Sequence, residues 1–484
     1  MTLKPLAIAA LATASLCAGH AAAASAVVPP SLGWSQLWTT SHSGDAEIVD
    51  FDSTTNTLWV TGASGIDVLS LSTGGLQTHL DLSSFGSVNS VSIFNGLAAV
   101  AVAAPTITDP GTVRFYNTTT FAVDGVVNVG ALPDMVTFTA DGARVLVANE
   151  GEAKDGVDPL GSVSIIDVAT RNAASPTVAT AGFGGVSLPA GVRSTTLADI
   201  EPEYIAVAPD GHTAFVALQE ANAIATLDLN TNSFTSVAAL GTKDFSQPGN
   251  AIDPNDRDGS IALRSVNARG LYQPDGIASY AANGQTYIVS ANEGDARADE
   301  SDEARAGTLG VSGDLARLTL STLDSSASDL VAFGARSFSI WDANGNPVFD
   351  SGNQLEMEAI ARGIYDDGRS DNKGVEPEGV SLMEIAGRTI AFIGLERTTR
   401  SAIAMYDVTD PANASFIDMI VGTSDIAPEG LKAFAVGSEL FLAVSNEQSA
   451  TTTLYALAPV PEPETWALML AGLGLLGRAA RRRR

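Results

Sequence analysis

The sequence predicts an all-β fold, a seven-bladed β-propeller with long insertions between strands. The main observation is one unit that occurs five times: a proline beside an acidic residue, two apolar runs separated by a turn, and a closing glutamate 17 to 19 residues after the proline. Two degenerate copies precede these five, at residues 46–60 and 88–102. Seven β units suit a propeller, which hides its sheet edges by closing into a ring. Two stacked β-sandwiches are the alternative, but they leave the repeated proline and acid unexplained.

Each unit is predicted to be a β-hairpin, often followed by further strands. In the first complete unit, the apolar runs are residues 136–138 and 145–147, and Asp141-Gly142 supplies a turn that needs positive φ. Returning strands are predicted at 145–147, 214–216, 287–289, 391–393 and 441–443, and third strands at 163–167, 224–228 and 403–407. Long insertions interrupt the repeat at 172–199, 241–271 and 294–373, and insertions of this length are usually functional or disordered.

The N-terminus has the order of a secretory signal peptide. Lys4 precedes an apolar stretch over residues 5–18, and small residues follow over 21–26. We expect cleavage near Ala24, so that residues 1–24 form the signal peptide and the propeller spans residues 44–458. A buried N-terminal helix is the alternative.

The C-terminus predicts a sorting signal over residues 460–484. Pro461, Glu462 and Pro463 precede an apolar run at 465–477, and Arg478 and Arg481 to Arg484 follow it. This short apolar helix, with arginines that match the positive-inside rule, is a weak transmembrane segment, since a stable span takes about 20 residues. The order resembles the PEP-CTERM sorting signal of Gram-negative bacteria. That resemblance implies recognition and removal by an exosortase-type enzyme, then surface attachment or release. A permanent membrane anchor is the alternative.

Charge and cysteine content exclude several classes of function. The chain has 26 Lys and Arg against 55 Asp and Glu, a formal net charge of −29. Such a surface repels nucleic acid and suits cations, Ca²⁺ above all. The single cysteine, Cys17, lies in the predicted signal peptide, so the mature chain is expected to have no disulfide and no thiol nucleophile. His42, His79 and His212 lack the spacing of a zinc site.

The repeated acids are predicted to meet around one mouth of the central channel. The two ends of a hairpin lie together, and the first strand of each propeller blade lines the axis. Close carboxylates repel one another, so bound cations, arginines or backbone N–H groups must offset them. The alternative is that each acid only caps its own turn. The predicted rim comprises Asp134, Glu150, Glu203, Glu220, Asp275, Glu293, Asp295, Glu378, Glu396, Glu429 and Glu447, with Arg297 and Arg397 as the candidate counter-charges.

A second candidate metal site is the loop that contains Asp253, Asn255 and Asp258. Oxygen-bearing side chains at alternating positions before Gly259 resemble a calcium loop. Such loops carry a glutamate near the twelfth position, where this sequence has Arg264. An ordinary acidic turn explains the pattern equally well.

Characteristic motifs surround the repeated acids of the predicted rim. They lie at residues 132–139, 147–152, 201–205, 272–278, 291–297 and 369–379. Their combination resembles the choice-of-anchor I proteins over about residues 44–457. The resemblance implies a secreted, propeller-like fold with a C-terminal anchor and an extracytoplasmic location, and it implies no established reaction.

Two classes of function are therefore considered. The first is a non-catalytic protein, on the outer surface or outside the cell, that binds a cation, an exopolysaccharide or another component of the extracellular matrix. The second is a calcium-dependent phosphoester hydrolase, in which Ca²⁺ clamps phosphate and activates water, as in phytase-like propellers. Phosphate chemistry also needs several cationic side chains. The mature chain has only four lysines, so the sequence favours binding: Lys154, Lys243, Lys373 and Lys432.

Overall fold

The computed structural model describes residues 32–194, 196–297 and 302–459. The predicted signal peptide and sorting signal, including the apolar helix and its arginines, lie outside these residues. In the described part of the chain, no helix is both long and apolar enough to cross a membrane.

Seven four-stranded antiparallel sheets make up the body of the described chain. The first three are β2 (Val49–Asp52), β3 (Thr57–Gly62), β4 (Gly65–Ser70) and β5 (Leu76–Asp81); β6 (Val88–Phe94), β7 (Leu97–Val102), β8 (Pro110–Asn117) and β9 (Val123–Ala131); and β10 (Pro133–Phe138), β11 (Arg144–Asn149), β12 (Ser162–Asp167) and β13 (Val178–Gly182). The next two are β14 (Ile205–Val207), β15 (Thr213–Leu218), β16 (Ala223–Asp228) and β17 (Ser233–Ala239); and β20 (Ile277–Ala282), β21 (Gln285–Ala291), β25 (Phe338–Asp342) and β26 (Pro347–Asp350). The last two are β27 (Pro377–Ile385), β28 (Arg388–Leu395), β29 (Ala402–Asp407) and β30 (Ser415–Val421); and β31 (Pro428–Val436), β32 (Glu439–Asn446), β33 (Thr451–Pro459) and β1 (Leu32–Ser41).

The first strands of the seven sheets contact one another in a closed circuit. β2 contacts β6, and the contacts continue through β10, β14, β20, β27 and β31 back to β2. The predicted β-propeller is therefore confirmed, and the repeated hairpins are its inner strands. In the turn of the third sheet, Gly142 has φ +68° and its N–H donates to the Thr139 carbonyl at 2.8 Å, as the Asp-Gly pair predicts.

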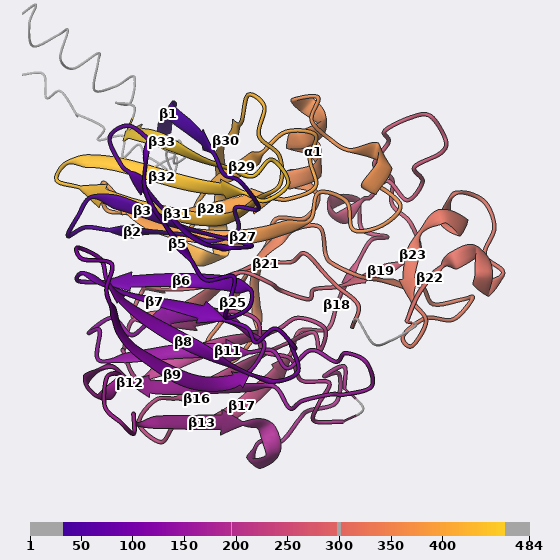
Figure 1. Cartoon of the computed structure of the whole chain (residues 1–484). Coiled ribbons are helices and arrows are strands. Elements are labelled where there is room, and N and C mark those ends of the chain that lie inside the picture. Colours follow the sequence, from indigo (N-terminus) through magenta and orange to yellow (C-terminus); the bar gives the residue numbers. More distant parts are fainter. Residues whose placement is uncertain (1–31, 195, 298–301, 460–484) are drawn as a thin grey trace, which may run out of the picture.

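The two ends of the described chain close the ring together. β1 pairs antiparallel with β33, so the last sheet combines the N-terminal strand with the three C-terminal strands (Figure 1). The propeller strands thus begin at Leu32, before the predicted start at residue 44. The partner of β1 lies at the opposite end of the sequence, and a local pattern of apolar residues does not reveal such a pairing.

Apolar side chains fill the spaces between neighbouring sheets. Between the last two sheets, for example, Phe392, Ile403 and Leu442 have no exposed surface. Burying a side chain of this kind contributes about 1.5–3 kcal/mol. The buried indole of Trp341 also satisfies its one donor, by a 2.8 Å hydrogen bond to Ser290.

The insertions around the fifth sheet form a separate layer beside the propeller, on the right in Figure 1. This layer has its own apolar cluster around Phe245, Leu318 and Leu320. Its strands are β18 (Thr242–Asp244), β19 (Arg269–Leu271) and β24 (Val331–Ala332) in one sheet, and β22 (Glu303–Arg305) and β23 (Thr319–Ser321) in another. Helical segments are α1 (Gln354–Ala361) and the 3₁₀ turns η1 (Val168–Thr170), η2 (Phe183–Gly185), η3 (Pro248–Asn250), η4 (Ala306–Leu309), η5 (Asp314–Arg317), η6 (Asp367–Arg369) and η7 (Pro411–Asn413).

Candidate cation site

In three of the five complete units, the acid after the repeated proline lies at an irregularity of its strand. The pairing register shifts between Pro377 and Val380 in β27, and between Pro428 and Leu431 in β31. An irregularity of this kind leaves residues without a ladder partner and redirects their side chains. Asp134 occupies the same place between Pro133 and Met135.

The glycine that follows the acid permits the close approach of the neighbouring sheet. The Gly430 N–H donates to the carbonyl of Glu47 at 2.9 Å, and a Cβ on Gly430 would lie only 2.3 Å from that oxygen. The Gly276 N–H donates in the same way to the Glu378 carbonyl, at 3.2 Å. The Pro-acid-Gly sequence therefore links adjacent strands at the level of their acids.

Three of the hairpins bring the closing glutamate back to the opening acid by the same backbone contact. The N–H groups of Glu150, Glu396 and Glu447 donate to the carbonyls of Leu132, Glu376 and Ala427, which directly precede the repeated prolines. Leu132, Glu376 and Ala427 have φ between +45° and +59°, a left-handed conformation that costs free energy in residues other than glycine. The predicted proximity of opening and closing acids is thus built from backbone contacts.

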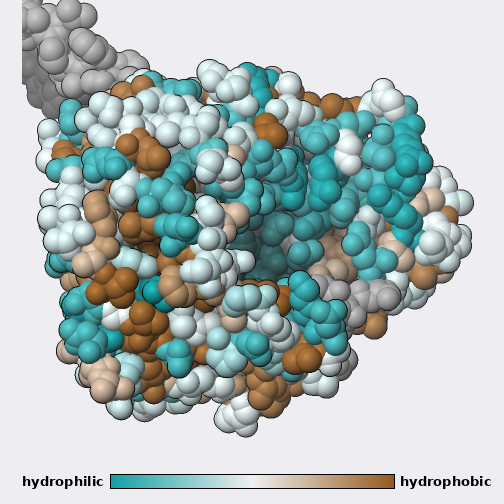
Figure 2. Space-filling model, in the orientation of Figure 1, coloured by the Kyte–Doolittle hydropathy of each residue, from teal (hydrophilic) through white to brown (hydrophobic). Residues whose placement is uncertain are grey.

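The first strands line a central cavity of about 700 Å³. The face seen in Figure 2 is hollowed near its middle, where hydrophilic side chains gather. We call the end of the channel at the repeated acids the acidic mouth. The repeat did not predict Glu47 as a member of this mouth; it precedes β2 in the first degenerate unit and lines the cavity with Asp134 and Asp275. Asn89 takes the corresponding place in the second sheet.

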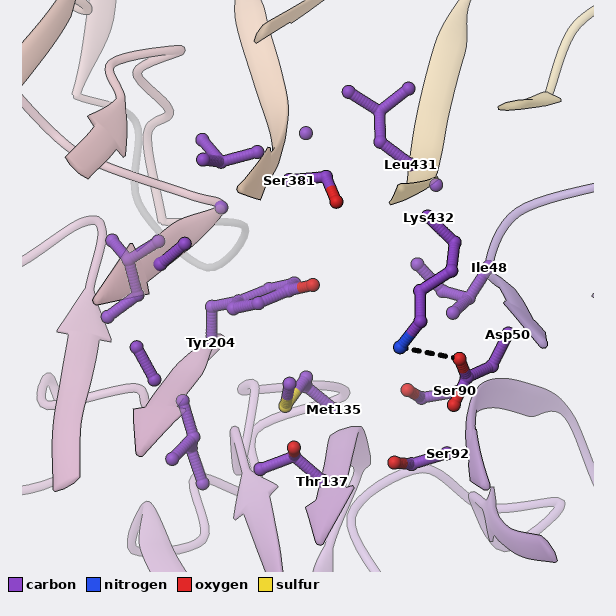
Figure 3. Close-up of a pocket in the computed structure, with 18 of the residues that line it drawn as sticks. Ile48, Asp50, Ser90, Ser92, Met135, Thr137, Tyr204, Ser381, Leu431 and Lys432 are labelled. Atoms are coloured by element: carbon purple, nitrogen blue, oxygen red, sulfur yellow. Dashed lines mark ion pairs between the residues drawn. The ribbon is translucent and has the colours of Figure 1, made fainter. Parts of the chain in front are cut away.

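Deeper in the channel, the lining is mostly neutral. Lys432 forms an ion pair with Asp50 at 2.7 Å across two adjacent strands, and Tyr204 extends into the same space (Figure 3). Asp50 also accepts the Ile93 N–H at 2.7 Å. Its charge is therefore satisfied within the protein.

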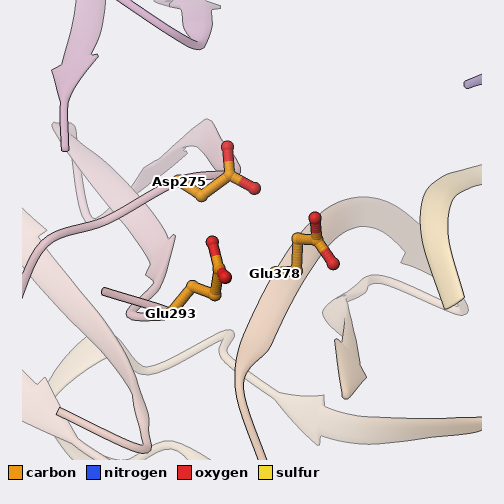
Figure 4. Close-up of side chains that lie close together, drawn as sticks. All are labelled: Asp275, Glu293 and Glu378. Atoms are coloured by element: carbon orange, nitrogen blue, oxygen red, sulfur yellow. The ribbon is translucent and has the colours of Figure 1, made fainter. Parts of the chain in front are cut away.

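Three carboxylates of the acidic mouth come close enough to share one ion. Asp275, Glu293 and Glu378 each place an oxygen within 4.8 Å of the other two (Figure 4). They come from the fifth and sixth sheets: Asp275 precedes β20, Glu293 follows β21, and Glu378 lies in β27. The Oε2 atom of Glu378 is buried and has no hydrogen-bond partner in the described structure.

Burial and mutual repulsion raise the pKa values of the acids at the mouth. Burial, followed by neighbouring carboxylates, raises the pKa of Glu47 to about 7 and that of Asp134 to about 6. Burial also raises the pKa of Glu220 to about 7 and that of Glu396 to about 8, although Arg397 opposes the shift of Glu396. The pKa values of five further acids are raised well above the ordinary range, by burial first and then by nearby acids: Glu150, Glu203, Asp275, Glu378 and Glu429.

Both predicted arginines contact acids, and a lysine joins them. Arg397 lies 2.8 Å from Glu396, its neighbour in sequence. The buried side chain of Arg297 lies 3.1 Å from Glu201, a partner that sequence spacing did not suggest. Lys373 Nζ lies 2.9 Å from Glu293 and 3.7 Å from the half-exposed Asp295. Lys373 belongs to an insertion, so the repeat gave no reason to place it here.

A second group of three acids overlaps the first. Glu293, Glu376 and Glu396 also place oxygens within 4.8 Å of one another. Glu376 is fully buried and directly precedes Pro377. Glu376 was not predicted as a rim residue, because it neither follows a proline nor closes a hairpin.

The candidate loop around Asp253 contains an arginine at its centre. Arg264 Nη2 lies 3.0 Å from Asp258, 3.3 Å from Asp314 and 3.6 Å from the fully buried Asp253. Asn255 donates to Asp314. Arg264, which stands where a calcium loop has a glutamate, thus supplies a positive charge to these acids. This contact favours the interpretation of the loop as an ordinary acidic turn.

Sequence comparisons agree with this architecture. The family model described as the choice-of-anchor I domain matches residues 47–411. The chain belongs to the choice-of-anchor I family. The PEP-CTERM protein-sorting motif matches residues 459–484, which implies recognition by exosortase-type sorting machinery. A choice-of-anchor I protein with this motif is exported to the cell surface of a Gram-negative bacterium, as predicted. No curated protein matches the sequence.

Solved propellers resemble this choice-of-anchor I protein in fold. Kuenenia stuttgartiensis hydrazine synthase matches with a TM-score of 0.51 and 10% identity, over 87% of this chain and 98% of that chain. The RRP9 WD40 repeats match with a TM-score of 0.51 and 10% identity, over 89% and 99%. At this identity the likeness shows the fold alone.

Proposed function

We propose that the acidic mouth binds a divalent cation, Ca²⁺, and that the protein is a non-catalytic, calcium-dependent binding protein of the cell surface. The observation that carries the proposal is the convergence of Asp275, Glu293 and Glu378, whose oxygens lie within 4.8 Å of one another. Calcium ligands lie 2.3–2.6 Å from the ion, so two oxygens on one ion are at most about 5 Å apart. The three carboxylates satisfy this limit.

The energetics of the mouth support a cation. Asp275, Glu293 and Glu378 are partly buried, and carboxylates that repel one another in such a place either hold protons or require a positive charge. Asp275 and Glu378 have no ion pair among the described residues, and Glu378 Oε2 is buried without a partner. A hard, oxygen-seeking ion such as Ca²⁺ supplies the missing charge and uses the free lone pairs.

A bound calcium ion also gives the mouth a way to hold an anionic polymer. Three protein carboxylates leave coordination positions that water or ligand oxygens fill, since Ca²⁺ takes 6–8 ligands. The cell-surface location brings the protein into contact with exopolysaccharide and other matrix components. We therefore propose acidic polysaccharide of the extracellular matrix as the ligand class.

Phosphoester hydrolysis is the alternative, and the charges at the mouth favour it less. A phosphate in the site needs cationic side chains that are not already engaged. Lys373 and Arg397 both contact glutamates. Phosphatase and phytase assays with added and chelated calcium separate the two functions, because the binding proposal expects no turnover in either condition.

Thermal melting of the purified protein tests calcium binding. A ligand that binds only the folded state stabilises it by about 2.7 kcal/mol at 100 times its Kd. The melting temperature should rise with calcium chloride and fall with a chelator. Melting that is indifferent to both would remove the support for the proposal.

A further inference from the structure

The two overlapping groups of acids share Glu293 but differ in their counter-charges. The second group is surrounded by basic side chains: Arg369 Nη2 lies 2.6 Å from Glu376, and Arg397 lies 2.8 Å from Glu396. In the first group, Asp275 and Glu378 have no such partner among the described residues. The protein therefore supplies cations to every acid of the second group, including the shared Glu293, and leaves Asp275 and Glu378 of the first group without a protein cation among the described residues.

Lys373 lies within the second group. Its ammonium nitrogen is 2.9 Å from Glu293 Oε1 and 3.3 Å from Glu376 Oε2, and its side chain is 11% exposed. The side-chain amide of Gln219 donates a 2.9 Å hydrogen bond to Oε2, the other oxygen of Glu293. Each carboxylate oxygen has two lone pairs, so Glu293 can contact these donors and still face an ion in the first group.

The backbone on both sides of Lys373 is held in place by neighbouring residues. The fully buried Arg336 donates 2.7 Å hydrogen bonds to the carbonyls of Ser370 and Asn372, directly before the lysine. Gly374, directly after it, has φ +72°, and a Cβ there would lie 2.6 Å from Glu356. The lysine is thus held on both sides by contacts that it does not make itself.

We propose that Lys373 is a tethered cation that occupies the place of a second metal ion, so that the acidic mouth takes one divalent ion and not two. The inference rests on the proposed function, because it presumes that the first group binds an ion. An ammonium that forms ion pairs with two carboxylates supplies one positive charge between them without the exchangeable coordination that a metal provides. Lys373 therefore sets the number of ions bound at the mouth.

The test is to count bound calcium in the wild-type protein and in Lys373→Met. Methionine keeps an unbranched, mostly apolar stem and removes the charge. Each protein is dialysed against saturating calcium chloride, and calcium per chain is measured by elemental analysis. The wild type should bind one ion and Lys373→Met two. The double variant Lys373→Met/Glu376→Gln, which lacks a ligand of the second group, should return to one ion, and Lys373→Arg should retain one.

The outcomes distinguish this inference from the proposed function. A wild type that binds no calcium at the mouth contradicts the proposed function itself. A wild type with two ions at the mouth, or a folded Lys373→Met that still binds one, overturns the role of Lys373 alone. Failure of both Lys373→Met and Lys373→Gln to fold in saturating calcium also counts against it, because the second ion should replace the lost charge.

Discussion

Arg336 lies 3.1 Å from Glu356, and both side chains are fully buried. Tyr365 donates to the same carboxylate oxygen at 3.1 Å. Arg336 also binds the backbone carbonyls that precede Lys373. One buried ion pair therefore connects α1, which contains Glu356, to the loop that completes the acidic mouth.

Arg336→Met should destabilise the protein strongly. It leaves Glu356 buried without its cation and deprives three backbone carbonyls, those of Asp253, Ser370 and Asn372, of this donor, which together cost about 3–5 kcal/mol. Denaturant unfolding measures the loss. Arg362→Met is the matched control, because Arg362 pairs with the partly exposed Asp418 and should lose less than about 1 kcal/mol. Equal losses in the two variants would contradict the structural role of the buried pair.

Glu378→Gln should abolish most of the calcium-dependent stabilisation. The amide keeps the shape of the side chain and removes one negative charge from the group of Asp275, Glu293 and Glu378. Without metal, the variant should be as stable as the wild type or slightly more stable, since like-charge repulsion is relieved. Thermal melting with calcium and with chelator gives both values. A drop of about 1–3 kcal/mol in both conditions would instead mean that Glu378 caps N–H groups.

Glu203→Gln is a second test at the mouth, in the fourth sheet. Burial and Glu220 raise the pKa of Glu203, so the substitution relieves the same repulsion. Because Glu203 is not one of the three acids assigned to the ion, calcium-dependent stabilisation should decline less in this variant than in Glu378→Gln. An equal loss in the two variants would contradict the assignment of the ion to the fifth and sixth sheets.

Asp258→Asn should leave the calcium response unchanged. Asp258 contacts Arg264 at 3.0 Å near the surface, and such pairs contribute about 0–1 kcal/mol. The same melting experiment applies. If this variant alone erased the calcium effect, the ion would lie in the loop of Asp253 and the assignment to the mouth would be wrong.

Stability without metal should fall as the pH rises from 5 to 8. The folded-state pKa values of Asp134, Glu47 and Glu396 are about 6, 7 and 8, above the ordinary carboxyl range near 4 that applies to the unfolded chain. At a pH between the unfolded-state and folded-state pKa values, the folded state holds more protons than the unfolded chain. The free energy of unfolding therefore decreases as the pH rises through this range. Calcium binds the ionised acids, so its stabilising effect should grow over this range. Melting at pH 5 and pH 8 tests both trends, and a calcium effect that is larger at pH 5 would contradict them.

The exported protein should lack both ends of the sequence. The predicted signal peptide ends near Ala24, and the sorting motif covers residues 459–484. Intact-mass analysis of protein from the native host checks this expectation. Detection of Met1 or Arg484 on the exported protein would contradict it.

The repeat predicts much of the fold and part of the mouth. The prolines and acids mark the strands that line the channel, because several blades use the same backbone contacts at the same place. Glu47 escaped detection because its unit lacks the proline. The roles of Lys373, Arg264 and Arg336 could not be predicted for another reason. These residues lie in insertions without periodicity, and contacts between distant segments determine their positions.

Crystallography with calcium, or with terbium as an anomalous scatterer in its place, tests the central claim most directly. The account predicts one peak among Asp275, Glu293 and Glu378, with oxygens at about 2.3–2.6 Å. A peak confined to the loop of Asp253, or a mouth that holds no ion at saturating concentration, would contradict it.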